Sequence, residues 1–333
     1  MSFPKEWEQI KKSAFEVFKE RIESRASEWC DIKGGAETGA AYRACREAFS
    51  KFSLRMNTIH SVTSPQTEVK VLGKRISTPT MIAPLAQTIL QLKPDGFLDF
   101  AKATGKIDSI TWIGFPNKRE VIQAIASQKL SPLIYIVKPL KDRNKIIDEF
   151  KFAKELGVHA VGIDIDSSAG LKTVGDESRF AEMSFPISPT ELGKIRKSTD
   201  LPLIVKGILD KKDAAAAVRA GVDAIVVSNH SGFALDYSKP SILALADVKS
   251  VVKDRAEIYL DSGVRRGTDI LKALALGARA VLIGSLPLWG LAIGGSEGVV
   301  HMFQMLTNEL KRAMILTGVQ KAERVPPDIL TSV

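Results

Sequence analysis

The chain has 333 residues, 45% of them hydrophobic, so it is long enough to bury a large core. Its two cysteines, Cys30 and Cys45, give neither a disulfide framework nor a metal-site spacing, and they favour a reducing compartment. The formal net charge of +9 is not clustered, and between Lys138 and Lys151 cations alternate with acidic residues, as on a solvated helix face. A nucleic-acid or membrane partner is therefore not expected, and the excess charge serves either an anionic ligand or a generally cationic surface.

Residues 1–80 are predicted to form a helical segment and a β-hairpin that pack on a larger domain. Residues 4 to about 57 show helical periodicity, and residues 58–80 contain β-branched pieces with turns at Pro65 and Gly73. The first residues include acidic groups where a signal peptide needs an apolar stretch, and no run approaches the roughly 18 apolar residues of a membrane span. We expect a cytoplasmic protein.

From residue 81 onward, short apolar runs alternate with helical segments, as in repeated βα units. Eight strands are expected, over residues 81–84, 110–113, 133–137, 160–165, 203–205, 224–227, 258–260 and 280–283. A helix end, a glycine and a short connection into a strand recur at Gly157, Gly221 and Gly277. These features predict an α/β fold, a (β/α)8 TIM barrel over residues 81–333 with an N-terminal helical extension.

The segments between the predicted strands have recognisable starts and one long connection. Ser188 to Glu191 has the spacing of a capping box, and Asp210 precedes an alanine-rich helix. Residues 167–187 are polar, so this connection is either a mobile lid or a tolerated insertion. A glycine-rich connection over 284–298 is predicted to lead into a closing helix over 299–316.

Polar groups directly follow the last four predicted strands. Lys206 follows the first of these strands, and His230 lies just after the second. The remaining two strands run into Asp261-Ser262-Gly263-Val264-Arg265 and into Gly284-Ser285. Because functional groups in α/β barrels collect past the carboxyl ends of the strands, the sequence predicts a site there that handles a phosphate and a proton.

Three segments carry a resemblance to a known family: residues 228–236, 261–269 and 272–278. Together they resemble the FMN-dependent L-2-hydroxy acid oxidases and dehydrogenases, which include glycolate oxidase, lactate oxidase and mandelate dehydrogenase. Similarity extends to residues 35–37, 81–84 and 141–144, so it covers most of the chain. The resemblance implies a (β/α)8 barrel, a non-covalent FMN and oxidation of a 2-hydroxy acid to a 2-oxo acid. It also implies a homo-oligomer, a tetramer or larger.

The resemblance assigns roles to particular residues. His230 takes the substrate hydroxyl proton while the α-hydrogen passes to flavin N5, and Asp166 orients the imidazole. Lys206 faces the flavin pyrimidine, where a fixed ammonium stabilises the negative charge of the reduced ring. The other implied flavin contacts are Pro84, Leu85, Ala86, Thr111, Ser228, Asp261, Ser262, Gly263, Arg265, Gly284 and Ser285. No metal is expected.

Several positions depart from the family pattern. Where the family has two substrate-binding arginines, this chain has Phe233 and either Lys172 or Thr173. Where the family has two substrate-binding tyrosines, it has Asp31 or Ile32 and Lys138. Two flavin contacts of the family fall at Ile136 and Asp164, and a phosphate-binding arginine falls at Ser285. Loss of bidentate arginine contacts to a carboxylate indicates an altered substrate. Phe233 suggests a less polar substrate, with Lys138 or Lys172 as anion contacts.

Three functions follow as hypotheses. The first is FMN-dependent oxidation of a 2-hydroxy acid or related alcohol, with hydride transfer to flavin N5 and His230 as the base. The second is a flavin-dependent isomerase that acts on a diphosphate, similar to isopentenyl diphosphate isomerase. The third is an FMN-binding protein that has lost catalysis. The Asn229-His230 pair and the run from Arg265 to Asp269 favour the first.

Overall fold

The structure is a computed structural model that describes residues 3–30, 34–86, 89–115, 118–170 and 182–332. Its central sheet has eight parallel strands in the spatial order β4-β11-β10-β9-β8-β7-β6-β5. Their bounds are β4 (Thr80–Ile82), β5 (Thr111–Gly114), β6 (Leu133–Val137), β7 (Ala160–Asp164), β8 (Leu203–Ile208), β9 (Ala224–Val227), β10 (Glu257–Leu260) and β11 (Ala280–Ile283). The two end strands meet because Leu85 bridges to Ile113 in parallel, so the sheet closes. The predicted (β/α)8 barrel is confirmed.

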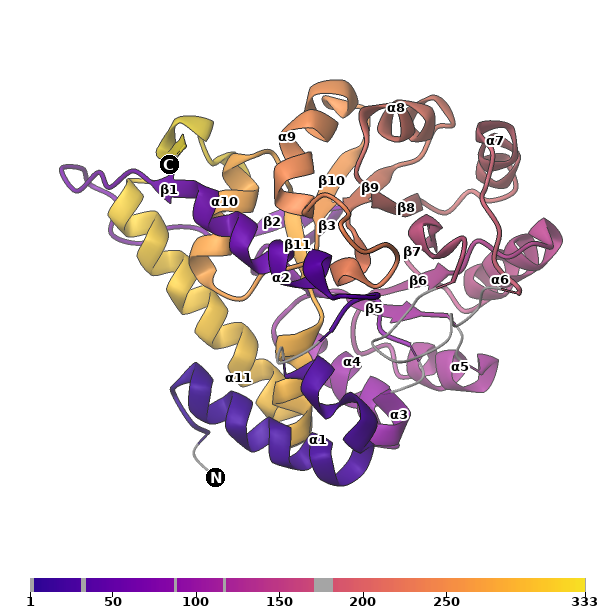
Figure 1. The fold of residues 1–333 in the computed structure, drawn as a ribbon, viewed down its shortest axis with the longest axis horizontal. Coiled ribbons are helices and arrows are strands. Elements are labelled where there is room, and N and C mark those ends of the chain that lie inside the picture. Colours follow the sequence, from indigo (N-terminus) through magenta and orange to yellow (C-terminus); the bar gives the residue numbers. More distant parts are fainter. Residues whose placement is uncertain (1–2, 31–33, 87–88, 116–117, 171–181, 333) are drawn as a thin grey trace.

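Helices surround the barrel in alternation with the strands (Figure 1). They are α3 (Ile89–Leu92), α4 (Gly96–Lys106), α5 (Arg119–Ser127), α6 (Arg143–Glu155), α7 (Pro189–Lys197), α8 (Lys211–Arg219), α9 (Ser241–Val252), α10 (Gly267–Ala275) and α11 (Ser285–Thr317). Two predicted starts are confirmed, since Ser188 and Glu191 form a reciprocal capping box and Asp210 accepts from the Lys212 amide.

The closing helix begins earlier than the sequence predicts. α11 starts directly after β11, and the glycine-rich stretch expected as a connection is helical except at Gly294 and Gly295. Gly295 has a φ of 56°, which interrupts the helical hydrogen bonding and kinks the helix at this pair. This earlier start places the N-terminus of α11 at the carboxyl ends of the barrel strands.

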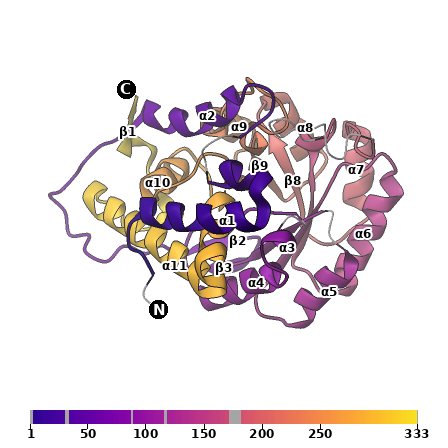
Figure 2. The same ribbon diagram turned by 60° about the horizontal axis from the view of Figure 1, so that its bottom comes forward.

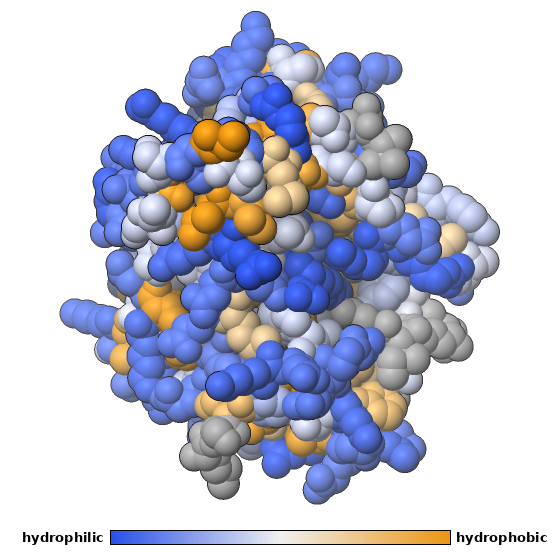
Figure 3. All heavy atoms as spheres, turned by 90° about the vertical axis from the view of Figure 1, so that its left-hand side faces the viewer, coloured by the Kyte–Doolittle hydropathy of each residue, from blue (hydrophilic) through white to orange (hydrophobic). Residues whose placement is uncertain are grey.

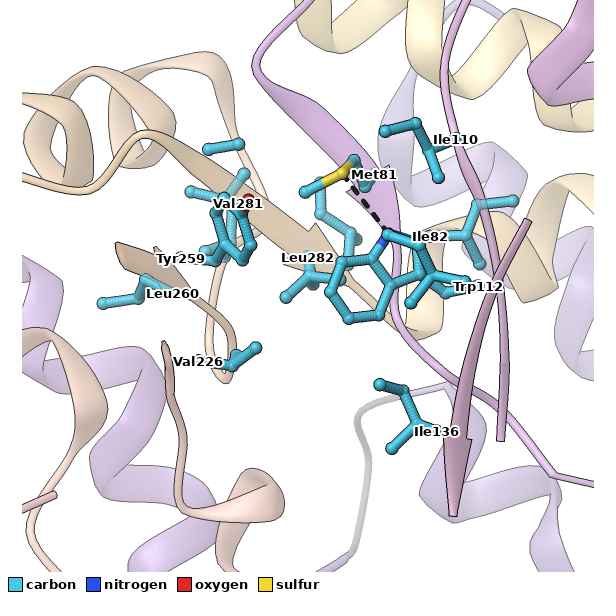
Figure 4. Packing of buried hydrophobic residues seen from close by; sticks show 14 of the residues in the cluster. Met81, Ile82, Ile110, Trp112, Ile136, Val226, Tyr259, Leu260, Val281 and Leu282 are labelled. Carbon is cyan, nitrogen blue, oxygen red and sulfur yellow. Dashed lines mark hydrogen bonds between the residues drawn. The ribbon is translucent and has the colours of Figure 1, made fainter. Parts of the chain in front are cut away.

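The interior of the barrel is filled by side chains rather than open (Figure 4). The rings of Trp112 and Tyr259, from β5 and β10, meet edge to face with centroids 6.1 Å apart. Trp112 Nε1 donates to Met81 Sδ at 3.3 Å, and the Tyr259 hydroxyl donates to Glu257 Oε2 at 2.6 Å. Because both buried polar groups have partners, the large aromatic rings fill the barrel without an unpaired donor.

The N-terminal part forms two helices, three short strands and a 3-10 turn. They are α1 (Trp7–Trp29), α2 (Ala40–Glu47), η1 (Ala48–Lys51), β1 (Phe52–Leu54), β2 (Val69–Val71) and β3 (Lys74–Ile76). The predicted helical region therefore ends before residue 57, where β1 pairs antiparallel with the C-terminal strand β12 (Leu330–Ser332). β2 and β3 form the predicted hairpin, and its Leu72 carbonyl lies 3.0 Å from His159 Nε2. The domain division at residue 80 stays a prediction.

The first helix and the segment after it lie against the barrel (Figure 2). Trp289 Nε1 in α11 donates to the Trp29 carbonyl at 2.7 Å, which fixes the end of α1. The Asp236 carboxylate, in the loop after β9, accepts from the backbone amides of Thr38 at 2.9 Å and Ala41 at 2.8 Å. The part of the chain before the barrel is thus tied to a loop at the carboxyl ends of the strands. Among the helices described, none is long and apolar enough to cross a bilayer.

We predict that Asp236→Asn flattens the acid dependence of stability. Burial opposes ionisation of Asp236, but hydrogen bonds from Ala41 and Thr38 outweigh it and lower its pKa to about 2. The charged carboxylate therefore stabilises the fold above pH ~4, and up to about 2 kcal/mol is lost as the pH falls toward 2. Urea unfolding at a series of acidic pH values measures this, and equal slopes in the native protein and the variant would contradict it.

Candidate active site

A cavity of about 690 Å³ opens at the carboxyl ends of the barrel strands, within the size range of small-molecule sites. It is lined by thirteen of the predicted site residues, namely Pro84, Leu85, Ala86, Lys138, Lys206, His230, Phe233, Asp261, Ser262, Gly263, Arg265, Gly284 and Ser285. The N-terminal part adds Glu28, Trp29 and Tyr42, which the sequence analysis did not identify. The structure therefore brings strand ends and N-terminal part together around one space.

Three predicted residues lie outside the cavity lining. Ser228 and Asp166 stand behind it, where each contacts His230. Thr111 lies at the opposite end of β5, with its hydroxyl 2.6 Å from Ser131 Oγ, and Gly114 forms the cavity end of that strand. The predicted flavin contact of Thr111 is corrected for this reason. Lys172 and Thr173, like Asp31 and Ile32, lie outside the described residues.

His230 begins the short 3-10 turn η3 (His230–Gly232) directly beyond β9. His230 Nδ1 lies 3.1 Å from Asp166 Oδ1, and the His230 amide donates to Ser228 Oγ at 3.0 Å. His230 and Ser231 have φ of 53° and 51°, a conformation that is unfavourable for residues other than glycine. Such strain concentrates at functional sites, because the surrounding structure must maintain it.

The approach of Asp166 to His230 depends on Gly207. Asp166 lies in η2 (Ile165–Ser167), and β8 shifts register between Lys206 and Ile208 where the two segments pass each other. Gly207 has a φ of 103°, and a Cβ atom there would lie 2.6 Å from Asp166 Cβ. Only glycine allows this backbone approach, so the position of the Asp166 carboxylate is set by its neighbour strand.

Asp164 is the residue whose importance the sequence analysis missed. Its Oδ2 lies 2.5 Å from Lys138 Nζ and its Oδ1 lies 3.1 Å from Lys206 Nζ. Asp164 and Lys206 are register partners on β7 and β8, while Lys138 follows β6. All three side chains are buried. Two positions that depart from the family pattern, 138 and 164, therefore form a buried ion pair with each other.

The charges in this cluster determine its protonation. Burial opposes ionisation of Asp164, but the positive charges of His230, Lys138 and Lys206 outweigh it and hold its pKa well below the usual range. Burial, followed by the charge of Asp164, raises the pKa of Asp166. Burial also disfavours the charged form of His230, yet Asp164 outweighs it, so the pKa of His230 is raised. Asp164 is thus the fixed negative charge of the cluster.

The hydrogen bonds of His230 indicate which nitrogen is basic. Nδ1 lies 3.1 Å from Asp166 Oδ1 and 3.3 Å from Lys206 Nζ. An ammonium only donates, and Lys206 has acceptors in Asp164 Oδ1 and in Ser228 Oγ at 3.2 Å. We therefore assign the proton to Nδ1, which donates to Asp166, and this leaves Nε2 as the acceptor.

Asp164, Asp166 and His230 also place three ligand atoms within 4.8 Å of one another, a spacing that resembles a metal site. The two ammoniums of Lys138 and Lys206 lie against both oxygens of Asp164, however. A divalent cation there would be repelled by two fixed positive charges at close range. The donor set consequently fits proton transfer better than metal binding.

The other end of the cavity fits a phosphate group. Arg265 Nη2 donates to Ser285 Oγ at 3.2 Å, and Ser285 is the first residue of α11. Helix N-termini attract anions through their unpaired amides. A Cβ atom added at Gly284 would meet only Leu85 Cδ2, at 4.0 Å, so the backbone here is open. Arg265, these amides and the Ser285 hydroxyl are therefore suited to hold a phosphate group.

Comparison with known proteins agrees with this geometry. The chain matches the family model described as FMN-dependent dehydrogenase over residues 19–186 and 169–332. It is 33% identical to 2-hydroxyacid oxidase 2 of Rattus norvegicus, covering 91% of this chain and 93% of that protein. With L-lactate oxidase of Lactobacillus jensenii the identity is 32%, covering 88% and 78%. A crystal structure of mandelate oxidase superposes with a TM-score of 0.87 at 27% identity, covering 98% and 97%.

The chain belongs to the FMN-dependent dehydrogenase family, as the resemblance implied. It is accordingly an FMN-dependent oxidoreductase built on a (β/α)8 barrel.

We predict that Gly207→Ala displaces Asp166 and lowers the pKa of His230, because the negative charge of Asp166 then lies farther from the imidazole. Titration of the His230 ring protons by NMR measures the shift. Gly193→Ala is the matched control, since Gly193 lies in α7 and a Cβ there meets nothing within 4 Å. An unchanged His230 titration in Gly207→Ala would show that Asp166 does not set this pKa.

Proposed function

We propose that this protein oxidises a 2-hydroxy acid or a related alcohol to the 2-oxo compound, with His230 as the base and Asp166 as its orienting carboxylate. The observation that carries the proposal is the contact of His230 Nδ1 with Asp166 at 3.1 Å, at a cavity that Lys206 also lines. FMN, when bound, supplies a two-electron acceptor for the hydrogen on the substrate carbon.

Each residue then has a defined task. His230 Nε2 accepts the hydroxyl proton, and the positive charge that forms on the imidazole is stabilised by Asp166 and Asp164. Lys206 provides a fixed positive charge at the ring end of the cavity, where negative charge develops on reduction. Its position is set by Asp164, Ser228 and Asp261, so little reorganisation is needed.

The two alternatives find less support. A diphosphate substrate needs several uncompensated cations, whereas Lys138 and Lys206 are both paired with Asp164. A chain that has lost catalysis has no reason to maintain the strained backbone at His230 and Ser231, at a cost of ~1–3 kcal/mol each. Oxidation of a hydroxy compound is consistent with both observations, the lysines paired with Asp164 and the strained backbone at His230 and Ser231.

We predict that His230→Ala retains FMN but reduces it at least ~100-fold more slowly, because the hydroxyl proton has no acceptor. In the native protein the rate should rise with pH through a His230 pKa that lies above the usual histidine value, since only the neutral imidazole is a base. Anaerobic bleaching by a panel of 2-hydroxy acids, esters and amides measures both effects. His301→Ala is the control, because His301 lies outside the cavity lining, with its Nε2 2.9 Å from the Pro4 carbonyl and its ring stacked on Phe3. Native-rate bleaching in His230→Ala would remove this role.

We further propose a cytoplasmic homo-oligomer, a tetramer or larger. Cys30 and Cys45 are buried and form no disulfide with each other, which supports a reducing compartment. Ile59 and Tyr237 are 95% and 76% exposed. On the face drawn in Figure 3, hydrophobic side chains gather in the upper part. Exposed apolar side chains of this size are typical of interfaces when they cluster. Sedimentation velocity measures the assembly, and a monomer at micromolar concentration would contradict the proposal.

A further inference from the structure

At the end of the cavity near His230, where the substrate would bind, neighbouring carboxylates neutralise the positive charges of the lysines. The described residues that line the cavity include two lysines, Lys138 and Lys206, and both form an ion pair with the carboxylate of Asp164. Lys206 also lies 3.4 Å from Asp261, which is a second lining anion, and Glu28 is a third. Apart from Arg265 at the phosphate end, the lysines of the described lining are thus matched by carboxylates.

A free carboxylate entering this space has to compete with Asp164 for the same ammoniums. Either Asp164 or the substrate then lies buried next to another anion, which is unfavourable at low dielectric. An amide or ester carbonyl brings no charge that needs compensation, so the ion pairs of Asp164 persist when it binds. The charges that line the cavity therefore favour an uncharged amide or ester over a free acid.

The wall of the cavity next to His230 is apolar. Phe233 packs edge to face on Tyr42 with centroids 5.9 Å apart, and both rings line the cavity. Leu85 and Phe115, which follow β4 and β5, line other parts of the same cavity. Phe233 stands where the resemblance implies a carboxylate-binding arginine, so an aromatic pair replaces a cation at this place. Such a wall favours an apolar substituent on the substrate.

We propose that the preferred substrate is an uncharged 2-hydroxy carbonyl compound with an apolar substituent, a 2-hydroxy amide or ester, rather than the free acid. This rests on the proposed function for the reaction itself. The hydroxyl proton passes to His230, the hydrogen on the same carbon leaves with its electron pair to FMN, and the product is the 2-oxo amide or ester. The carbonyl substituent is unchanged, and FMN is the oxidant.

Binding of unreactive probes tests the charge preference without turnover. Phenylacetamide and phenylacetate have the same shape, lack the hydroxyl that is oxidised, and differ by one charge. In calorimetric titrations of the FMN-loaded protein we expect the amide to bind at least tenfold more tightly. If the acid binds as tightly as the amide, or if neither probe binds, the proposal is overturned.

Two variants move the preference in the opposite direction. Phe233→Arg supplies an uncompensated cation, and Asp164→Asn removes the carboxylate that neutralises both lysines, so each should raise phenylacetate affinity about tenfold or more. Phe233→Leu is the matched control, because it removes the ring without adding charge and should leave the acid weakly bound. Unchanged acid affinity in both Phe233→Arg and Asp164→Asn would show that charge compensation does not set the preference.

Anaerobic bleaching with mandelamide and mandelate separates this proposal from the function on which it rests. Faster reduction by mandelamide supports both. Tight phenylacetamide binding together with no bleaching by any hydroxy compound would leave the charge preference intact and remove the proposed oxidation. Bleaching by mandelate at a higher rate than by mandelamide would instead keep the oxidation and overturn the substrate class.

Discussion

A single buried carboxylate, Asp164, holds the active-site cluster together. It contacts two ammoniums and the imidazole of His230, and each of these groups would be unfavourable in the barrel interior without it. Removing one member of such a cluster leaves the others uncompensated, which is why buried ion pairs respond strongly to single substitutions. The protonation of His230, the position of Lys206 and the charge that a substrate meets all depend on this side chain.

The barrel and much of the site could be predicted from the sequence because both depend on local patterns. Apolar runs define buried strands, and polar groups that follow them must meet at one end of a parallel barrel. His230, Asp166, Lys206 and Arg265 were found in this way and through the resemblance. In the structure His230, Lys206 and Arg265 line one cavity, and Asp166 lies behind it against His230.

The remaining features depend on contacts between distant parts of the chain. Asp164 and Lys138 lie 26 residues apart, and each looks like a loss of a family residue until their ion pair is seen. Thr111 was misplaced because a strand sequence alone does not fix which end or face of the strand reaches the cavity. Glu28, Trp29 and Tyr42 carry no motif, and only the tertiary packing of the first helices brings them to the site.

The way in which Asp236 secures the N-terminal part also bears on the order of folding. This carboxylate accepts hydrogen bonds from the amides of Thr38 and Ala41, which lie 198 and 195 residues earlier in the sequence. Thr38 and Ala41 can therefore bind this carboxylate only after the loop that follows β9 has been synthesised, and contacts between residues so far apart in sequence form late in folding. The N-terminal side of the pocket is therefore completed only after the loop that follows β9 has formed.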